Sequence, residues 1–370
     1  AVDLKFYTPG EDSAADRKVL DAALPWIVSA QANLVLVHID QVDFAGHHEG
    51  GPRDLRWNAA ASRADALLGE ILAAVDLTQD AVVVVSDHGH IRRGGHGGHD
   101  ADVLSEPFVL AGAGVLPGSY PDVGMIDVAP TLAVLLGTNL PASAWGQPLT
   151  QMLALDETQE RDLRIAGRAQ MAEVARVYQA AIGGPEVEEG DPSTLYSIPS
   201  RREARERLPR LALTAILFLF PLAWTVWKRP KGLKWMAAGG VLAAAVFYLY
   251  YTGVEGRALS LSAVDGQGQI LGSAALGSLI GLACGALLAG WGSRRLRDPL
   301  FWLTFALTAG YVAALPALWS YLVNGIDYSF TLPEFGSAFV GLLAALQAAF
   351  TCLAGLVIAA GLALPRKIKG

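Results

Sequence analysis

The feature that most constrains the fold of this 370-residue chain is a series of long apolar runs that begins at Leu211. Five runs occur, at roughly 211–227, 235–254, 269–291, 299–323 and 337–363. Each approaches the length of about 20 apolar residues that crosses a bilayer as a helix. In lipid, every backbone polar group needs an internal partner, which a helix provides. We therefore predict an all-α membrane domain over residues 211–364 with about five transmembrane helices, and an integral membrane protein.

The basic residues between these runs predict an orientation. They follow the first, third and fifth runs: Lys228, Arg229, Lys231, Lys234, Arg294, Arg295, Arg297, Arg366, Lys367 and Lys369. Positively charged loops face the cytoplasm, so we expect a cytoplasmic C-terminus and an extracytoplasmic N-terminal domain in a prokaryotic plasma membrane. The basic run 201–210 opposes this assignment. The apolar runs carry no Asp, Glu, Lys, Arg or His in their interiors, which disfavours a transporter.

The first 155 residues alternate between helical and strand-like patterns. Helical spacing covers 13–30, 54–76 and 127–137, and short apolar runs at 33–40, 81–89 and 106–115 are typical of buried strands. Such alternation predicts an α/β fold with a parallel sheet covered on both faces. A charged amphipathic helix and linker at 156–210 would join this domain to the membrane domain. The net charge of −7 argues against a nucleic-acid partner.

All seven histidines of the chain lie between residues 38 and 99. They alternate with aspartates in HIDQVDFAGHHEG (38–50) and SDHGHIRRGGHGGHD (86–100), both at the expected carboxyl ends of strands, where ligands bind in such sheets. Imidazole and carboxylate ligands suit a divalent ion such as zinc or manganese. Three ligands plus two indicate two ions about 4 Å apart, as in hydrolytic sites. The candidate ligands are Asp43, His47, Asp87, His88 and His96.

The other histidines are weaker candidates. His99 is the main rival of His96 as a ligand, because both lie in the same glycine-rich stretch. His38 belongs to the predicted strand 33–40 and is expected to pack there or to support a ligand. His48 and His90 are less favoured than the five candidates.

The histidine motifs resemble those of a known superfamily. HIDQVDFAGHHEGGP (38–52), then SDHG (86–89), then GGHGG (94–98), resemble the alkaline phosphatase superfamily. The likeness covers roughly residues 30–150 and is greatest to the type I phosphodiesterase/nucleotide pyrophosphatase branch and to the GPI ethanolamine-phosphate transferases, which also join such a domain to a multi-span membrane region. The resemblance implies a partial alkaline-phosphatase-like parallel-sheet sandwich over residues 1–155. It also implies one zinc ion held by Asp43, His47 and His96, and a second held by Asp87 and His88, with manganese as the alternative metal.

The resemblance also implies a nucleophile, a Thr or Ser that attacks phosphorus. In the family this residue lies well before the position that corresponds to residue 30. Thr8 and Ser13 follow no strand that ends in an aspartate, and Ser86 is expected to end a strand. We therefore expect the chain to be the C-terminal part of a longer enzyme whose nucleophile lies outside it.

Two functional hypotheses follow. The first is a membrane-anchored, metal-dependent phosphoester hydrolase or phosphoryl-group transferase, similar to the phosphoethanolamine transferases, which acts on a phosphoester such as a lipid or glycolipid headgroup. The second is a non-catalytic, membrane-bound metal-binding or scaffold protein with a degenerate site. A sulfatase is disfavoured, because that family uses a modified Cys or Ser and both cysteines, Cys284 and Cys352, lie in apolar runs.

Overall fold

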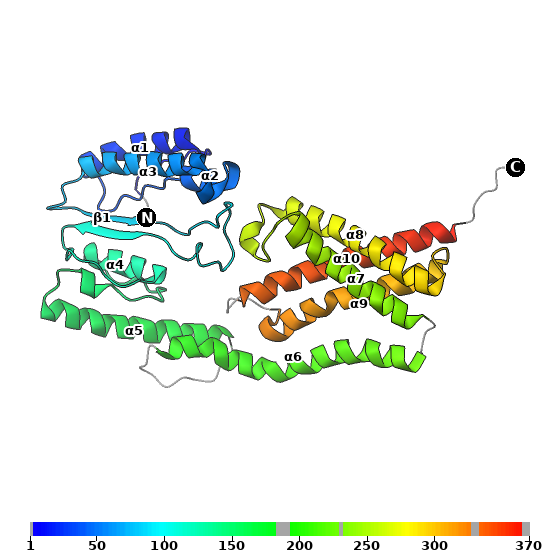
Figure 1. Ribbon diagram of the computed structural model, residues 1–370. Coiled ribbons are helices and arrows are strands. Elements are labelled where there is room, and N and C mark those ends of the chain that lie inside the picture. The colour runs from blue at the N-terminus through cyan, green and yellow to red at the C-terminus, as the bar shows by residue number, and fades with distance from the viewer. Residues whose placement is uncertain (1–2, 183–192, 229–231, 327–332, 365–370) are drawn as a thin grey trace. The chain divides into compact units, whose positions relative to one another are not determined.

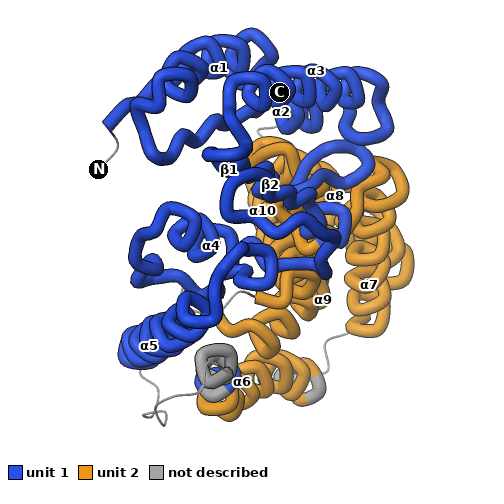
Figure 2. The backbone as a smooth tube through the Cα atoms, turned by 90° about the vertical axis from the view of Figure 1, so that its left-hand side faces the viewer, with its two compact units in different colours: residues 1–96, 100–203 blue, residues 97–99, 204–370 orange. Residues whose placement is uncertain are grey.

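The computed structural model describes residues 3–182, 193–228, 232–326 and 333–364, which form two compact units. One unit comprises residues 1–96 and 100–203, and the other comprises residues 97–99 and 204–370 (Figure 2). The first unit contains helices and a small sheet, whereas the second is helical. The predicted class, a partial α/β domain followed by an all-α domain, is confirmed.

The first unit places its helices on both sides of the sheet (Figure 1). Helices α1 (Ser13–Val28), α2 (Gln41–His48) and α3 (Leu55–Ala74) lie on one side. Helices α4 (Val128–Leu135) and α5 (Glu157–Ile182) lie on the other. The aspartates Asp12 and Asp54 begin α1 and α3 by accepting hydrogen bonds from the first backbone amides of each helix. These helices therefore begin within two residues of their predicted starts.

The sheet corrects two predictions. Strands β1 (Ala81–Val85) and β2 (Phe108–Gly112) pair antiparallel, with Ala81 opposite Gly112, so the predicted parallel pairing is wrong for the strands that the structure describes. A long loop without a crossover helix connects them, and such a connection returns the chain in the opposite direction. The predicted strand 33–40 is not a strand: it has no β partner among the described residues, and Leu36 is 89% exposed.

The second unit contains four helices long and apolar enough to cross a membrane, counted among the described residues. They are α7 with its π-helical extension (Leu233–Val254), α8 (Gln267–Ser293), α9 (Pro299–Asn324) and α10 (Phe335–Ala363). Helices α7 and α8 pack so closely that a Cβ on Gly239 or Gly285 would overlap with the other glycine's carbonyl oxygen. The glycine-rich third run therefore serves close helix packing.

The first predicted span, 211–227, is the C-terminal part of α6 (Ser193–Lys228) and is not among these four helices. A span at 211–227 and the predicted orientation stay predictions. The basic residues Arg229, Lys231, Arg366, Lys367 and Lys369, on which the orientation partly depends, lie outside the described residues.

A buried carboxylate fixes the start of α2, the helix that carries Asp43. Asp16 of α1 is 2% exposed, and its two oxygens accept hydrogen bonds from the backbone amides of Asp40 (2.9 Å) and Gln41 (3.1 Å). The side chain of Gln41 accepts a further bond from Arg63 of α3 (2.8 Å). A carboxylate at a helix N-terminus satisfies amides that lack partners within the helix. Asp16 thus holds α2 in place from outside.

Replacing Asp16 by alanine is expected to lower the free energy of unfolding by about 2 kcal/mol, because it leaves two amides at the start of α2 without an acceptor. Hydrogen exchange of the α2 amides at increasing urea concentration measures the change. The matched control is Asp21→Ala on the same helix, which removes only a solvent-exposed ion pair with Arg17 and should cost under about 1 kcal/mol. Equal effects of the two substitutions would contradict this role of Asp16.

Candidate metal centre

Helix α2 supplies the first two side chains of the centre. Asp43 and His47 lie one helical turn apart, so both side chains project from the same face. The Nε2 atom of His47 lies 3.6 Å from Oδ2 of Asp43. One short helix thus brings a carboxylate and an imidazole to the same place.

The loop after β1 supplies the other imidazoles. The loop turns at once: Ser86 Oγ donates to the His88 carbonyl (2.8 Å), and the His88 amide donates to Asp87 Oδ1 (3.1 Å). The amide of Gly89 then donates to the carbonyl of Val103 in the returning part of the loop (2.8 Å). These bonds hold the segment that presents His88, His90 and His96 to α2.

Four imidazoles surround the Asp43 carboxylate. Its Oδ1 atom lies 2.9 Å from His90 Nε2, 3.4 Å from His96 Nε2 and 4.0 Å from His88 Nε2. The rings of His88 and His96 stack with their centroids 3.7 Å apart. Ligand atoms within 4.8 Å of one another form two groups, Asp43 with His47 and His96, and Asp43 with His88 and His90. A carboxylate among imidazole nitrogens is a donor set that fits zinc.

The structure brings together four of the five predicted ligands. Asp43, His47 and His96 form one group, and His88 belongs to the other. The side chain of Asp87 is 75% exposed and belongs to neither group, although its Oδ2 lies 3.6 Å from His88 Nε2.

The remaining histidines lie elsewhere. His99 is exposed and is grouped with the second unit, so among the described contacts it is His96 that lies beside Asp43. The ring of His48 packs against Phe44, with centroids 4.5 Å apart. His38 lies in the irregular segment before α2 and belongs to neither group around Asp43.

His90 is the residue that the sequence analysis ranked too low. Its side chain is only 5% exposed, and its Nε2 makes the shortest contact with Asp43. No signal in the sequence indicated it, because β1 ends at Val85 and His88 and His90 lie in the loop that turns directly after this strand.

The electrostatics of the centre favour metal-binding protonation states. Burial alone would raise the pKa of Asp43, but the hydrogen bond with His90 and the charges of His47, His90 and His96 outweigh it, so the pKa lies below its ordinary value. Burial, and then the neighbouring His88, lower the pKa of His96. An ionised carboxylate and a neutral imidazole are the forms that bind a metal ion.

Three glycines allow α2 and the histidine loop to approach each other. A Cβ on Gly46 would overlap with the ring of His90, and a Cβ on Gly94 would overlap with the carbonyl oxygen of Gly46. A Cβ on Gly51 would overlap in turn with the amide of Gly94. Gly94 also has a φ of +84°, a conformation that favours glycine. The centre therefore depends on backbone contact between α2 and the loop.

Comparison with known proteins places the chain near phosphoryl-transfer enzymes. It is 25% identical over 144 residues to the catalytic subunit of GPI ethanolamine phosphate transferase 3 from Homo sapiens, a match that covers 38% of this chain and 13% of that protein. It is 28% identical over 134 residues to GPI ethanolamine phosphate transferase 3 from Schizosaccharomyces pombe, covering 34% and 14%.

A second kind of relative is the 2,3-bisphosphoglycerate-independent phosphoglycerate mutase of Rhodopseudomonas palustris, which is 29% identical over 136 residues, covering 35% of this chain and 25% of the mutase. The chain thus matches a quarter or less of the length of these relatives. No solved structure matches it.

The family model of the type I phosphodiesterases and nucleotide pyrophosphatases matches residues 5–213. This range includes both histidine motifs and the whole centre around Asp43, and it exceeds half of the 370 residues. The chain therefore belongs to the type I phosphodiesterase / nucleotide pyrophosphatase family.

Proposed function

We propose that the chain is the metal-binding part of a membrane-anchored phosphodiesterase or phosphoryl-group transferase. The observation that carries the proposal is the Asp43 carboxylate, which belongs to two three-ligand groups at once. A carboxylate shared between neighbouring groups can bind an ion on each side, as enzymes that act on phosphoesters with two metals require. The chain's family membership supports the same chemistry.

The proposed ligands follow from the motifs and the distances. Asp43, His47 and His96 would hold one divalent ion, zinc or manganese. His88 would hold the second, together with Asp87 as the resemblance implies, or with His90 and Asp43 as the structure groups them. When bound, such ions withdraw charge from phosphoryl oxygens and lower the pKa of an attacking hydroxyl. His90 also orients Asp43 by holding its Oδ1 atom.

The proposed nucleophile is a Thr or Ser that precedes residue 30 in the family's order of motifs. Ser13 is the first residue of α1, and neither Thr8 nor Ser13 has a described contact with the residues around Asp43. We therefore propose neither Thr8 nor Ser13 as the nucleophile.

The proposed substrate is a phosphoester of a lipid or glycolipid headgroup. One kind of relative is a GPI ethanolamine phosphate transferase, and the other is a phosphoglycerate mutase. Four apolar helices associate the chain with a membrane, where lipid headgroups are concentrated.

The test uses the full gene product, purified in detergent, stripped of metal with a chelator and reloaded with zinc or manganese. We expect about two ions per chain and release of p-nitrophenolate from bis(p-nitrophenyl) phosphate. The variants Asp87→Ala and His90→Ala separate the two ligand sets for the second ion, because the variant that lacks a true ligand binds one ion fewer. Absence of bound metal would overturn the proposal. Metal without turnover would favour the non-catalytic metal-binding protein instead.

A further inference from the structure

The loop between α8 and α9 carries an unneutralised basic cluster, which consists of Arg294, Arg295 and Arg297. The loop lines an open hollow of about 600 Å³ together with Gly290, Leu296 and Asp298. All three arginines are exposed, and none has an acidic side chain within 4.0 Å among the described residues. The one carboxylate in the lining, Asp298, accepts a hydrogen bond from the Leu300 amide at the start of α9 (2.9 Å). The hollow therefore has an excess of positive charge.

The backbone that presents the basic cluster is fixed by several contacts. The amide of Arg294 donates to the Gly290 carbonyl (2.7 Å), and the indole of Trp302 donates to the Leu296 carbonyl (2.8 Å). Arg294 ends α8 with a φ of +56°, in the left-handed region where helices usually place glycine. An arginine there costs free energy that a glycine would not.

Tryptophans place the basic cluster at the boundary between membrane and water. Trp291 precedes the loop and is 75% exposed, and its ring lies 5.9 Å from that of Trp235 at the start of α7. Trp302 follows the loop within the first turn of α9. Tryptophan rings settle at the headgroup level of a bilayer. Guanidinium groups beside them therefore reach the depth of the lipid phosphates, and Lys234, with Nζ 5.7 Å from the Trp235 ring centre, adds charge there.

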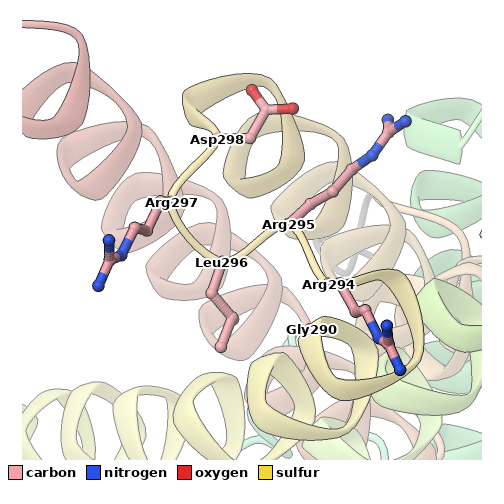
Figure 3. Close-up of a pocket in the computed structure, with 6 residues that line it drawn as sticks. All are labelled: Gly290, Arg294, Arg295, Leu296, Arg297 and Asp298. Atoms are coloured by element: carbon pink, nitrogen blue, oxygen red, sulfur yellow. The ribbon is translucent and has the colours of Figure 1, made fainter.

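We propose that the basic cluster binds the phosphate groups of anionic glycerophospholipids. A guanidinium group is planar and binds phosphate oxygens through paired hydrogen bonds. Figure 3 shows the three guanidinium groups directed outward from the loop, with Arg297 on the opposite side from Arg294 and Arg295. This spread suits several headgroups of a lipid leaflet, whereas a single phosphate ion would need converging groups. The ligand class is thus a lipid with a net negative headgroup.

The test compares binding of phosphatidylglycerol by the wild-type protein and by a variant that carries Arg294→Gly, Arg295→Ala and Arg297→Ala. Glycine at 294 keeps the left-handed turn. Native mass spectrometry of the protein in detergent micelles with added phosphatidylglycerol gives the apparent Kd. We expect the Kd of this variant to be at least tenfold higher than that of the wild type. The Kd should rise less when all three arginines become lysine, because lysine preserves the charge.

The matched control removes the same charge elsewhere, through Arg161→Ala, Arg164→Ala and Arg168→Ala on α5, and should leave the Kd unchanged. Equal binding by the wild type and the first variant would overturn the proposal. A second result would also overturn it. If millimolar inorganic phosphate raised the Tm of the wild type as much as phosphatidylglycerol does, the site would bind free phosphate. If the first variant does not fold, the lysine variant provides the test. A Kd at least threefold higher than that of the wild type supports bidentate phosphate binding by the arginines, and an unchanged Kd overturns such binding.

Discussion

Replacing Asp43 by alanine should weaken binding at both ion positions and lower the affinity for zinc by at least about 100-fold, more than the loss of an outer-shell partner costs. The reason is geometric, since the carboxylate belongs to both ligand groups. The substitution also removes the carboxylate that contacts His90 at 2.9 Å, which leaves that buried ring without this partner. Equilibrium dialysis against zinc, followed by metal analysis, measures the effect.

The control for this experiment is Asp102→Ala. Asp102 lies in the same loop as His88, His90 and His96, is exposed, and belongs to neither ligand group. The Asp102→Ala protein should bind as much zinc as the wild type. A second comparison is His47→Ala, which disrupts one group and leaves the other intact, so that about half of the metal should remain. An Asp43→Ala protein that retains two ions would contradict a shared carboxylate.

Local sequence signals predicted the helices well. The pattern over 13–30 became α1 (Ser13–Val28) and that over 54–76 became α3 (Leu55–Ala74), because each helix has its capping aspartate one residue before it. Caps and periodic apolar residues act over a few positions, so they can be read from the chain. The same holds for Asp43 and His47, whose spacing on a helix brings them together without help from distant residues.

Pairing between distant segments could not be read in this way. The apolar run 33–40 has the composition of a strand, yet strand formation needs a neighbour, and the described residues provide none. The direction of β2 relative to β1 depends on the loop 86–107 rather than on either strand's residues. Apolar alternation predicts that a segment is extended, but it does not state which segment lies beside it.

The position of His90 shows the same limit within the centre. Its ring reaches Asp43 only because the loop packs on α2, and this approach depends on Gly46 and Gly94. No property of the sequence GHIRRGGHGG specifies contact with a helix some 40 residues earlier. The motif resemblance had already indicated Asp43, His47 and His96, which the structure groups together, but it did not include His90.

Replacing Gly94 by alanine should therefore disrupt the centre, although it adds only a single methyl group. The new Cβ would overlap with the carbonyl oxygen of Gly46, a backbone atom of α2 that cannot move without moving the helix. We expect a loss of about 3 kcal/mol in the free energy of unfolding, as for overpacked interiors. Zinc binding should fall with it, because the loop would carry His88, His90 and His96 away from Asp43.

Two glycines separate the causes of this effect. Gly137 has a φ of +64° and open space around its Cβ position. The substitution Gly137→Ala therefore introduces only backbone strain, which should lower the free energy of unfolding by about 1 kcal/mol. Gly69 lies inside α3 with nothing within 4 Å of a Cβ, so Gly69→Ala should stabilise the helix by up to about 1 kcal/mol. Neither should change zinc binding, as dialysis and urea unfolding would show. If Gly94→Ala matched Gly137→Ala in both measurements, backbone contact between α2 and the loop could not be what holds the histidines around Asp43.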